Sequence, residues 1–418
     1  MKAFITAVAI LAQCWTLTGQ AQEMSRLRVG THEANSSGGD VEKSKAGYGL
    51  QTEVALVTSA LPVSSNPAEH KRGDHKRGDR DVDVMTVNLY VGGDSGRILA
   101  LDPTDPGYMY KLPATVAGVY GEIVASDPPA RLQTVADEIA ARMPDIVAVE
   151  EASLIRRQSP GDLLFGGTNA ATEVVFDYLQ ILVADLAAQG ACYTVVSTAN
   201  EMDVELPMLV SFQPLAIDDV RLSDREAILV RSDLPHGQLR VTNPQSGNFA
   251  NVIEIPSLGL AIERGWCSVD VAMRGRDFRF ICAHAEQETA PQLQALQVQE
   301  LLAGPANTKQ PVILVGDFNA DPLHRDGSFA YDLIPAAGFT DAWAKLHPTT
   351  PAGGLTWGHD ELLADPLTLF DRRIDFVFYH GKGLVPKHAD VIALTTGLRP
   401  SPLWATDHAA VYATFEIK

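Results

Sequence analysis

The chain has 418 residues, of which 46% are hydrophobic and 20% are charged, a composition that excludes a disordered protein and allows a large folded core. Its formal net charge of −19 at pH 7 repels polyanions at long range. This weakens a nucleic-acid-binding function without excluding a local basic surface.

The N-terminus has the order of a secretory signal peptide. Met1 and Lys2 precede an apolar run over residues 3–12, and the small-residue pattern Gly19-Gln20-Ala21 follows. The run is too short to span a membrane, and no later stretch has the roughly eighteen uninterrupted apolar residues of a spanning helix. We therefore expect residues 1–21 to be a signal peptide and the protein to be secreted, to the cell exterior or the periplasm, without a transmembrane segment.

Residues 22–83 predict a flexible linker, because they are rich in Gly, Ser, Glu, Lys and Asp and show no sustained apolar period. They contain a near-tandem repeat, His-Lys-Arg-Gly-Asp, over residues 70–79. Its Arg-Gly-Asp triplets raise a non-enzymatic alternative, an exported adhesion or binding protein on a degenerate fold. We expect residues 84–418 to form one domain and the protein to be a monomer.

From residue 84 onward, strand-like and helix-like patterns alternate. Helices are predicted at residues 131–143, 176–189 and 292–302, and strands at residues 84–89, 145–149, 192–197, 227–231, 267–273, 278–283, 312–316, 374–379 and 409–415. Short turns join several of the later strands, so mixed and antiparallel pairing is expected. The pattern predicts an α/β fold of four layers, an α/β/β/α sandwich of two mixed sheets with helices outside.

The three cysteines that follow the predicted signal are Cys192, Cys267 and Cys282. The last two fall on strands that we expect to form a hairpin around residues 274–277. They could form a disulfide in an oxidising compartment, and buried free thiols are an equal alternative.

The strongest chemical signal is the segment 311–322, in which an apolar strand leads to Gly316-Asp317-Phe318-Asn319. Because side chains alternate along a strand, Asp317 and Asn319 point to the same side of its end. A carboxylate there can orient an attacking water, and a neutral amide can donate to a phosphate oxygen. A strand that simply ends in an Asx-type turn is the alternative.

This Gly-Asp-Phe-Asn stretch resembles the signature of the endonuclease/exonuclease/phosphatase family, which includes deoxyribonuclease I-like enzymes, abasic-site nucleases, inositol polyphosphate phosphatases and bacterial sphingomyelinases. Other family segments occur in the expected order. By this resemblance Asn88, at the end of a strand, lies beside the metal ion and the scissile phosphate. Residues 144–151 resemble the strand that ends in the metal-binding glutamate, which places Glu151 at the ligand position, or Glu150 if the register shifts by one.

Two later segments complete the set by the same resemblance. His284 ends a strand and would protonate the leaving group or stabilise the phosphate, although Ala285 and Glu286 depart from the Thr-His-Leu of most members. In the closing segment His408 would engage the phosphate or the water, Asp375 would fix its tautomer, and Asp407 would support the metal site.

Two supporting positions carry less specific signals. Glu226 begins a strand where a carboxylate could orient His284, and Arg264 could contact phosphate. Both could equally be surface ion-pair residues. The stretch 200–207 is expected to shape the cleft.

The resemblance implies a hydrolase in which water attacks phosphorus in line. Asp317 and His408 would activate the nucleophile, and Mg²⁺, or another divalent cation such as Mn²⁺ or Ca²⁺, would neutralise developing charge. No nucleotide cofactor is expected, because no Gly-rich phosphate loop is present. The expected substrate is a phosphodiester, nucleic acid before a sphingomyelin-like phospholipid and a phosphomonoester third. The segments 92–129 and 235–251 read as loops that favour none of them.

Overall fold

The computed structural model describes residues 80–235, 237–255, 260–350, 352–365, 370–395 and 403–418. The predicted signal peptide, the repeat and nearly all of the predicted linker lie outside these residues. The first strand begins at Asp81, three residues before the predicted domain boundary, because Asp81 already pairs with Glu416 of the last strand.

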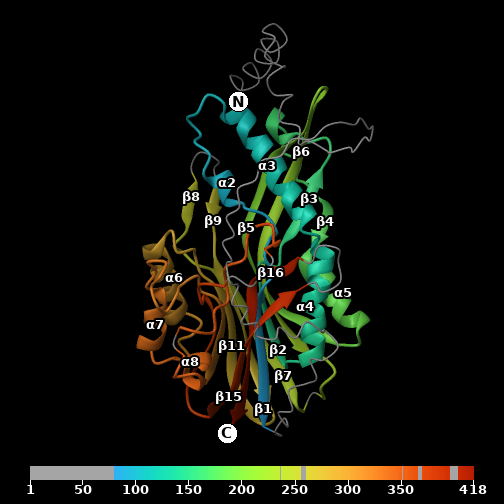
Figure 1. Ribbon diagram of the computed structural model, residues 1–418. Helices are drawn as coiled ribbons and strands as arrows, with labels where there is room; N and C mark the ends of the chain where they lie inside the picture. The colour runs from blue at the N-terminus through green and yellow to red at the C-terminus, as the bar shows by residue number, and fades with distance from the viewer. Residues whose placement is uncertain (1–79, 236, 256–259, 351, 366–369, 396–402) are drawn as a thin grey trace, which may run out of the picture. The chain divides into compact units, whose positions relative to one another are not determined.

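Two mixed β-sheets form the centre of the fold, as Figure 1 shows. In the described part of the chain, the first sheet has the order β15 (Leu384–Thr395), β16 (Trp404–Ile417), β1 (Asp81–Asn88), β2 (Ile146–Glu150), β6 (Leu215–Arg231), β3 (Leu154–Gln158) and β4 (Glu173–Asp177), and β5 (Tyr193–Phe212) pairs with β6. The second has the order β13 (Thr340–Asp341), β14 (Asp375–His380), β12 (Val312–Asp317), β11 (Arg276–His284), β10 (Gly265–Met273) and β7 (Leu239–Asn248). A separate pair consists of β8 (Ile253–Ile255) and β9 (Leu260–Ile262).

The helices and the short 3₁₀ turn connect these strands. They are α2 (Gly96–Leu99), α3 (Tyr108–Ala125), α4 (Pro128–Arg142), η3 (Leu163–Phe165), α5 (Tyr178–Ala188), α6 (Pro291–Ala303), α7 (Ala330–Ala336) and α8 (Ala342–Leu346). None of the helices in the described residues is both long and apolar enough to cross a membrane.

Side-chain alternation along the strands produces the layers. One face of the first sheet, with Val84 and Ile146, packs against Phe280 of the second sheet. The opposite face of the same strands, with Met85 and Val147, packs against α4 and α5. On the far side of the second sheet, β11 and β12 pack against α6 and α7. The fold is therefore the predicted four-layer sandwich, with α4 and α5 on one side in Figure 1 and α6 and α7 on the other.

The segment 92–129 was expected to be a loop, and this was wrong, because it contains α2 and the eighteen-residue helix α3. Gly118 and Gly121 lower the helix propensity of α3, and Pro113 lies inside it, so its periodicity is weak. The helix is stabilised by packing against the long β5–β6 hairpin, where Leu112 and Val116 meet Met208. Likewise, the segment 235–251 contains β7.

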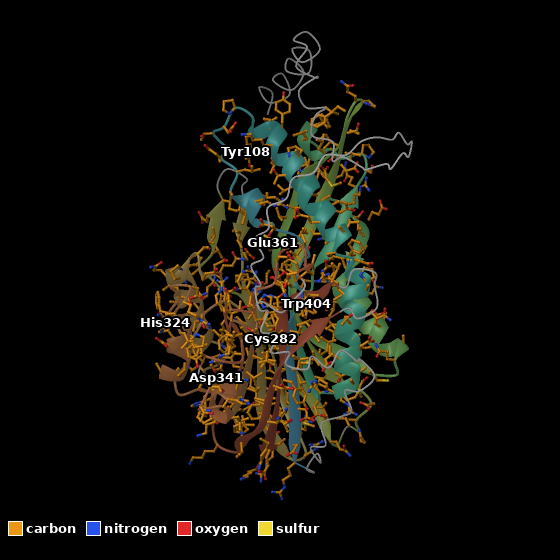
Figure 2. All side chains as sticks on the ribbon, in the orientation of Figure 1. Tyr108, Cys282, His324, Asp341, Glu361 and Trp404 are labelled. Atoms are coloured by element: carbon orange, nitrogen blue, oxygen red, sulfur yellow. The ribbon has the colours of Figure 1, made fainter. Side chains whose placement is uncertain are left out.

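The predicted hairpin of β10 and β11 is confirmed, and it places Cys267 directly opposite Cys282. Both are buried free thiols, so the structure contains no disulfide between them. Cys282, labelled among the strands in Figure 2, donates from Sγ to Glu150 Oε1 at 3.2 Å.

Candidate active site

The candidate site lies where strands of both sheets end at the same edge. In the second sheet, Asp317 is in register with His284 on one side and with Asp375 on the other. In the first sheet, Asn88 is in register with Glu150, one residue before Glu151. The strand pairing itself therefore brings together residues that lie far apart in the sequence.

Asn88 connects the two sheets. Its Nδ2 donates to Glu151 Oε1 at 3.2 Å and to Asp317 Oδ2 at 3.1 Å. Its Oδ1 accepts from the backbone N–H of Tyr90 at 2.9 Å, which fixes the orientation of the amide. The side chain is fully buried.

The two adjacent glutamates have different surroundings. Glu150 lies between the sheets, where its Oε1 accepts from Thr86 Oγ1 at 2.7 Å, and burial raises its pKa to about 7. Glu151 has a φ of 52°, in the left-handed region, and this conformation turns its carboxylate to Asn88 and to the N–H of Val91, 2.9 Å from Oε2. Of the two expected alternatives, Glu151 is the one that contacts Asn88, and Glu150 contacts Thr86.

His408 forms a buried charged pair with Asp375. Its Nδ1 lies 2.9 and 3.1 Å from the two oxygens of Asp375. Burial lowers the pKa of His408, but the charges of Asp375 and Asp407 outweigh this and hold the pKa well above its usual value. The ring therefore carries a proton on Nε2, which lies 3.8 Å from Asp317 Oδ2.

Asp317 and Asn319 form a compact turn at the end of β12. The N–H of Asn319 donates to Asp317 Oδ1 at 2.8 Å, so the Asx-type turn weighed as an alternative is present together with the clustered site. Asn319 Nδ2 donates to Ala285 O at 3.1 Å. Burial, reinforced by the charge of Asp375, raises the pKa of Asp317 well above its usual value.

Asp407 has a carboxylate oxygen without a hydrogen bond. Its Oδ2 accepts from Trp357 Nε1 at 3.2 Å, whereas its buried Oδ1 has no hydrogen-bond partner in the part of the chain that the structure describes and lies 3.8 Å from His408 Nε2. Burial raises the pKa of Asp407 to about 6, and the charge of Glu151 adds to this. The carboxylates of Asp407 and Glu151 are therefore close enough for each to disfavour the negative charge of the other.

His284 is a neutral ring held by Arg264. The Arg264 Nη1 lies 3.1 Å from His284 Nδ1, and a guanidinium can only donate, so Nδ1 accepts and the ring proton lies on Nε2. Burial and the charge of Arg264 lower the pKa of His284 well below its usual value. Its Nε2 lies 3.6 Å from Asp317 Oδ2.

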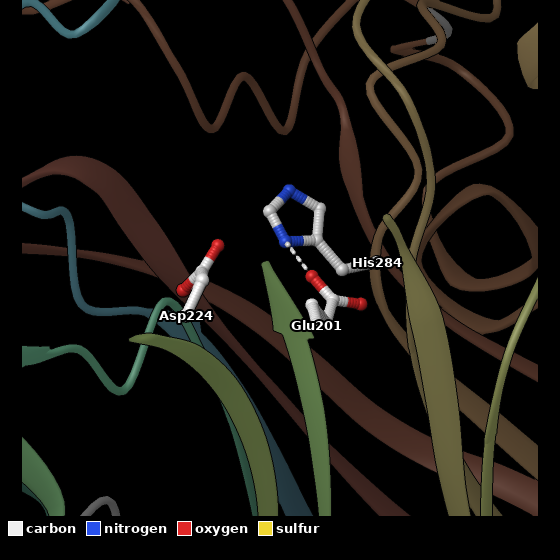
Figure 3. A group of neighbouring side chains, drawn as sticks. All are labelled: Glu201, Asp224 and His284. Carbon is white, nitrogen blue, oxygen red and sulfur yellow. Dashed lines mark ion pairs between the residues drawn. The ribbon is translucent and has the colours of Figure 1, made fainter. Parts of the chain in front are cut away.

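Buried carboxylates surround Arg264 and His284. Figure 3 shows Glu201 and Asp224 beside His284, and Glu201 Oε2 lies 3.7 Å from His284 Nδ1. Glu226 Oε1 lies at the same distance, farther than Arg264 is, so the predicted orienting carboxylate is near but not in hydrogen-bond contact. Burial and the adjacent Glu201 raise the pKa of Glu226 well above its usual value.

Arg264 is therefore a buried structural cation in this arrangement. Its guanidinium lies 3.5 Å from Asp224, 3.7 Å from Glu201 and 3.8 Å from Glu286. A phosphate contact or, as the alternative, a surface ion pair was expected for this residue; the structure shows ion pairs that are buried and not at the surface.

Among the described residues, two buried groups have carboxylate and imidazole atoms that all lie within 4.8 Å of one another: Glu201 with Asp224 and His284, and Asp317 with Asp375 and His408. Sequence reasoning gave no role to Asp224, and it named Glu201 only as part of the stretch 200–207 that was expected to shape the cleft. Asp224 lies two residues before Glu226 on the same strand face, a signal that could have found it. Glu201 lies within a register shift of β5 that no motif indicates.

A four-layer sandwich with buried carboxylate and imidazole groups at the strand ends defines a metal-dependent phosphoesterase. The chain belongs to the Endonuclease/Exonuclease/phosphatase family, whose family model matches residues 85–408. No curated protein matches the chain significantly.

Several solved structures are similar in fold. An endonuclease/exonuclease/phosphatase family protein from Leptotrichia buccalis is 14% identical, with a TM-score of 0.49, over 80% of this chain and 100% of that one. A family protein from Bacteroides thetaiotaomicron is 15% identical, with a TM-score of 0.49, over 81% and 98%. A mannosyl-6-phosphatase from the same species is 15% identical, with a TM-score of 0.47, over 79% and 98%. Identities this low carry no information about the substrate.

Proposed function

We propose that this phosphoesterase hydrolyses phosphodiesters by in-line attack of water, with a divalent cation, Mg²⁺ in the first instance, as its cofactor. One observation carries the proposal: the Nε2 atoms of His284 and His408 lie 3.6 and 3.8 Å from the same oxygen, Asp317 Oδ2. A carboxylate between two imidazole N–H groups combines an acceptor for a proton of water with donors for phosphate oxygens on either side.

Glu151 and Asp407 are the side chains that fit the cation. Asp407 Oδ1 is buried and has no hydrogen-bond partner among the described residues, and the charge of Glu151 helps to raise the pKa of Asp407. A divalent cation bound to these hard oxygen ligands would compensate both effects. Asn88 presents its N–H to Glu151, so it would hold this carboxylate in place. When bound, the cation supplies charge neutralisation for the phosphate.

The side chains of the chain itself divide the remaining work. Asp317 accepts a proton from the attacking water. His408, held by Asp375, presents a charged Nε2–H to a phosphate oxygen. His284 presents a neutral Nε2–H, because Arg264 donates to its Nδ1. Asn319 keeps Asp317 in position through its backbone N–H.

The test uses the full chain, stripped of metal with a chelator and then supplied with Mg²⁺, Mn²⁺ or Ca²⁺. Substrates are bis(p-nitrophenyl) phosphate, plasmid DNA and sphingomyelin. We expect Mg²⁺ to restore hydrolysis and Asp317→Asn to lower kcat by about 10²- to 10⁴-fold. Asp332→Asn, at a carboxylate whose side chain is 62% exposed, is the matched control and should leave kcat unchanged. Turnover by the chelated protein, or by Asp317→Asn at the unaltered rate, would refute the proposal.

We also propose export, which the signal-like order of residues 1–21 supports. Mass spectrometry of protein recovered from the medium or the periplasm tests it, because cleavage after Ala21 gives a defined mass. Full-length protein found only inside the cell would contradict it.

A further inference from the structure

An apolar cavity of about 100 Å³ lies beside the candidate active site. It is lined by the segment after β1, by α3, by the middle of β5 and β6 and by the β8–β9 pair. Of its lining side chains, only Ser95 and Tyr120 carry an oxygen, and none carries a formal charge. The cavity therefore offers carbon surface, with almost no group that could bind a polar ligand.

The cavity shares its elements with the active site. Val91 lines the cavity, while its backbone N–H donates to Glu151. Met202 lines the cavity directly after Glu201 in the chain, and Ile262 lines it two residues before Arg264. The wall of the cavity and the candidate active site are thus built on the same segments of the chain.

We infer that this cavity binds the start of an alkyl chain attached to the phosphodiester, so that the substrate class is a phospholipid. The inference rests on the proposed function, because the cavity selects a substrate only if a phosphodiester is bound next to it. Nucleic acid would place a sugar or a second phosphate there, and these groups need polar or cationic partners. An apolar cavity of roughly 150 Å³ stays dry and binds benzene, so one of this size takes a few methylene groups.

The reaction is a simple hydrolysis. The oxygen of water bonds to phosphorus, the bond from phosphorus to the oxygen of the lipid alcohol breaks, and that oxygen takes a proton. The products are the lipid alcohol, with its chain in the cavity, and the phosphomonoester of the headgroup. The second proton of the water stays on the phosphate or passes to solvent.

The hairpin that lines the cavity also indicates the source of the lipid. Beyond the cavity, the turn where β5 ends and β6 begins carries exposed apolar residues: Val210 is 50% exposed, Phe212 56% and Leu215 49%. Exposed aromatic and aliphatic side chains at a protruding turn suit the interfacial region of a bilayer. Because the chain carries a net charge of −19, a zwitterionic bilayer fits it better than an anionic one.

The first experiment compares substrates on the unmodified full chain with Mg²⁺. Monomeric dihexanoyl-phosphatidylcholine is compared with glycerophosphocholine, which has the same headgroup and no acyl chain, and with plasmid DNA. Each methylene moved from water into an apolar site improves binding about fourfold. Two or three of them predict that kcat/KM is about 15- to 60-fold higher for the lipid. Equal kcat/KM for the chain-free diester, or more efficient cleavage of DNA, would overturn the inference.

The second experiment fills the cavity. Ala261 of β9 lines it, and Ala261→Phe should bring the lipid to glycerophosphocholine ratio close to one while leaving hydrolysis of bis(p-nitrophenyl) phosphate unchanged. The control is Ala272→Phe, at a partly buried alanine of β10 outside the cavity lining, which should keep the ratio. An unchanged ratio in Ala261→Phe would refute binding of the alkyl chain in this cavity. If this variant does not fold, the comparison on the unmodified chain decides alone.

The third experiment tests whether the lipid comes from a bilayer or from dissolved monomers. The double variant Phe212→Ser, Leu215→Ser should lose at least tenfold in activity on phosphatidylcholine vesicles and keep its activity on the monomeric lipid. Unchanged activity on vesicles would overturn the bilayer as the source. Hydrolysis of bis(p-nitrophenyl) phosphate reports separately on the proposed function. If the protein hydrolyses this compound but does not prefer the lipid to glycerophosphocholine, only the inference about the cavity fails.

Discussion

The buried Glu150 should make the protein less stable as the pH rises. Its pKa is about 7 in the folded chain against 4.5 for an unperturbed group, chiefly because of burial. Between these values the folded state binds more protons than the unfolded state, so the stability falls with rising pH. From pH 5 to pH 8 the ionisation of this one group removes about 2.5 kcal/mol of unfolding free energy.

The substitution Glu150→Gln removes this titration while keeping an oxygen for the Thr86 hydroxyl. Urea unfolding, followed by tryptophan fluorescence for both proteins at pH 5 and pH 8, measures the effect. We expect the unfolding free energy of the variant, relative to that of the unmodified chain, to rise by about 2.5 kcal/mol from pH 5 to pH 8. A difference between the proteins that does not change with pH would refute the buried, proton-binding state of Glu150.

The same pair of residues gives a functional contrast. Glu150→Gln should keep metal-dependent hydrolysis within a few-fold, since Glu150 contacts Thr86 and Cys282 between the sheets. Glu151→Gln should weaken Mg²⁺ binding, measured by calorimetry, and lower activity at limiting Mg²⁺. The opposite outcome would show that Glu150, and not Glu151, is the metal ligand.

Three further predictions concern the rest of the site. Asp375→Asn removes a buried charge-assisted hydrogen bond to His408, worth about 1.5–3 kcal/mol, so kcat should fall by about 10- to 150-fold; a smaller loss in steady-state assays would argue against a working role for the pair. Arg264→Met leaves buried carboxylates without a compensating charge and should lower the unfolding free energy by about 3–5 kcal/mol, measured by thermal or urea unfolding. Arg264→Lys should restore part of this loss. Unaltered stability of Arg264→Met would contradict a structural role for the cation. Mg²⁺ at a hundred times its Kd should raise the unfolding free energy by about 2.7 kcal/mol, and Asp407→Asn should diminish this gain; equal gains in both proteins would place the cation elsewhere.

Four strands that carry the site, β1, β2, β11 and β12, could be predicted because each is an apolar run that stops at a polar residue. Asp317 illustrates this, since five buried residues precede it in β12. The apolar runs were sufficient to place His284 and Asp317 at the ends of their strands, whereas Asp375, the first residue of β14, was assigned by the family resemblance. Their mutual register, which brings them side by side, follows from tertiary pairing.

What the sequence could not predict depends on packing between distant segments. Helix α3 contains two glycines and a proline, and it is stable because the β5–β6 hairpin covers its apolar side. The surroundings of Arg264 come from β5, β6 and the segment after β11, so no local pattern indicates whether it meets solvent, phosphate or carboxylates. The left-handed turn at Glu151, which turns this carboxylate away from that of Glu150, has no glycine to mark it.

The amide of Asn88 has a consequence for how the enzyme loses activity. Its Nδ2 donates one hydrogen bond to Glu151 of the first sheet and another to Asp317 of the second sheet. The two hydrogen bonds of Asn88 therefore depend on the relative position of the two sheets. If one sheet slides over the other by a fraction of an ångström, their geometry is disturbed. Under gentle denaturation or pressure, activity should decline before circular dichroism changes, because strands can remain intact while the two halves of the site lose their alignment.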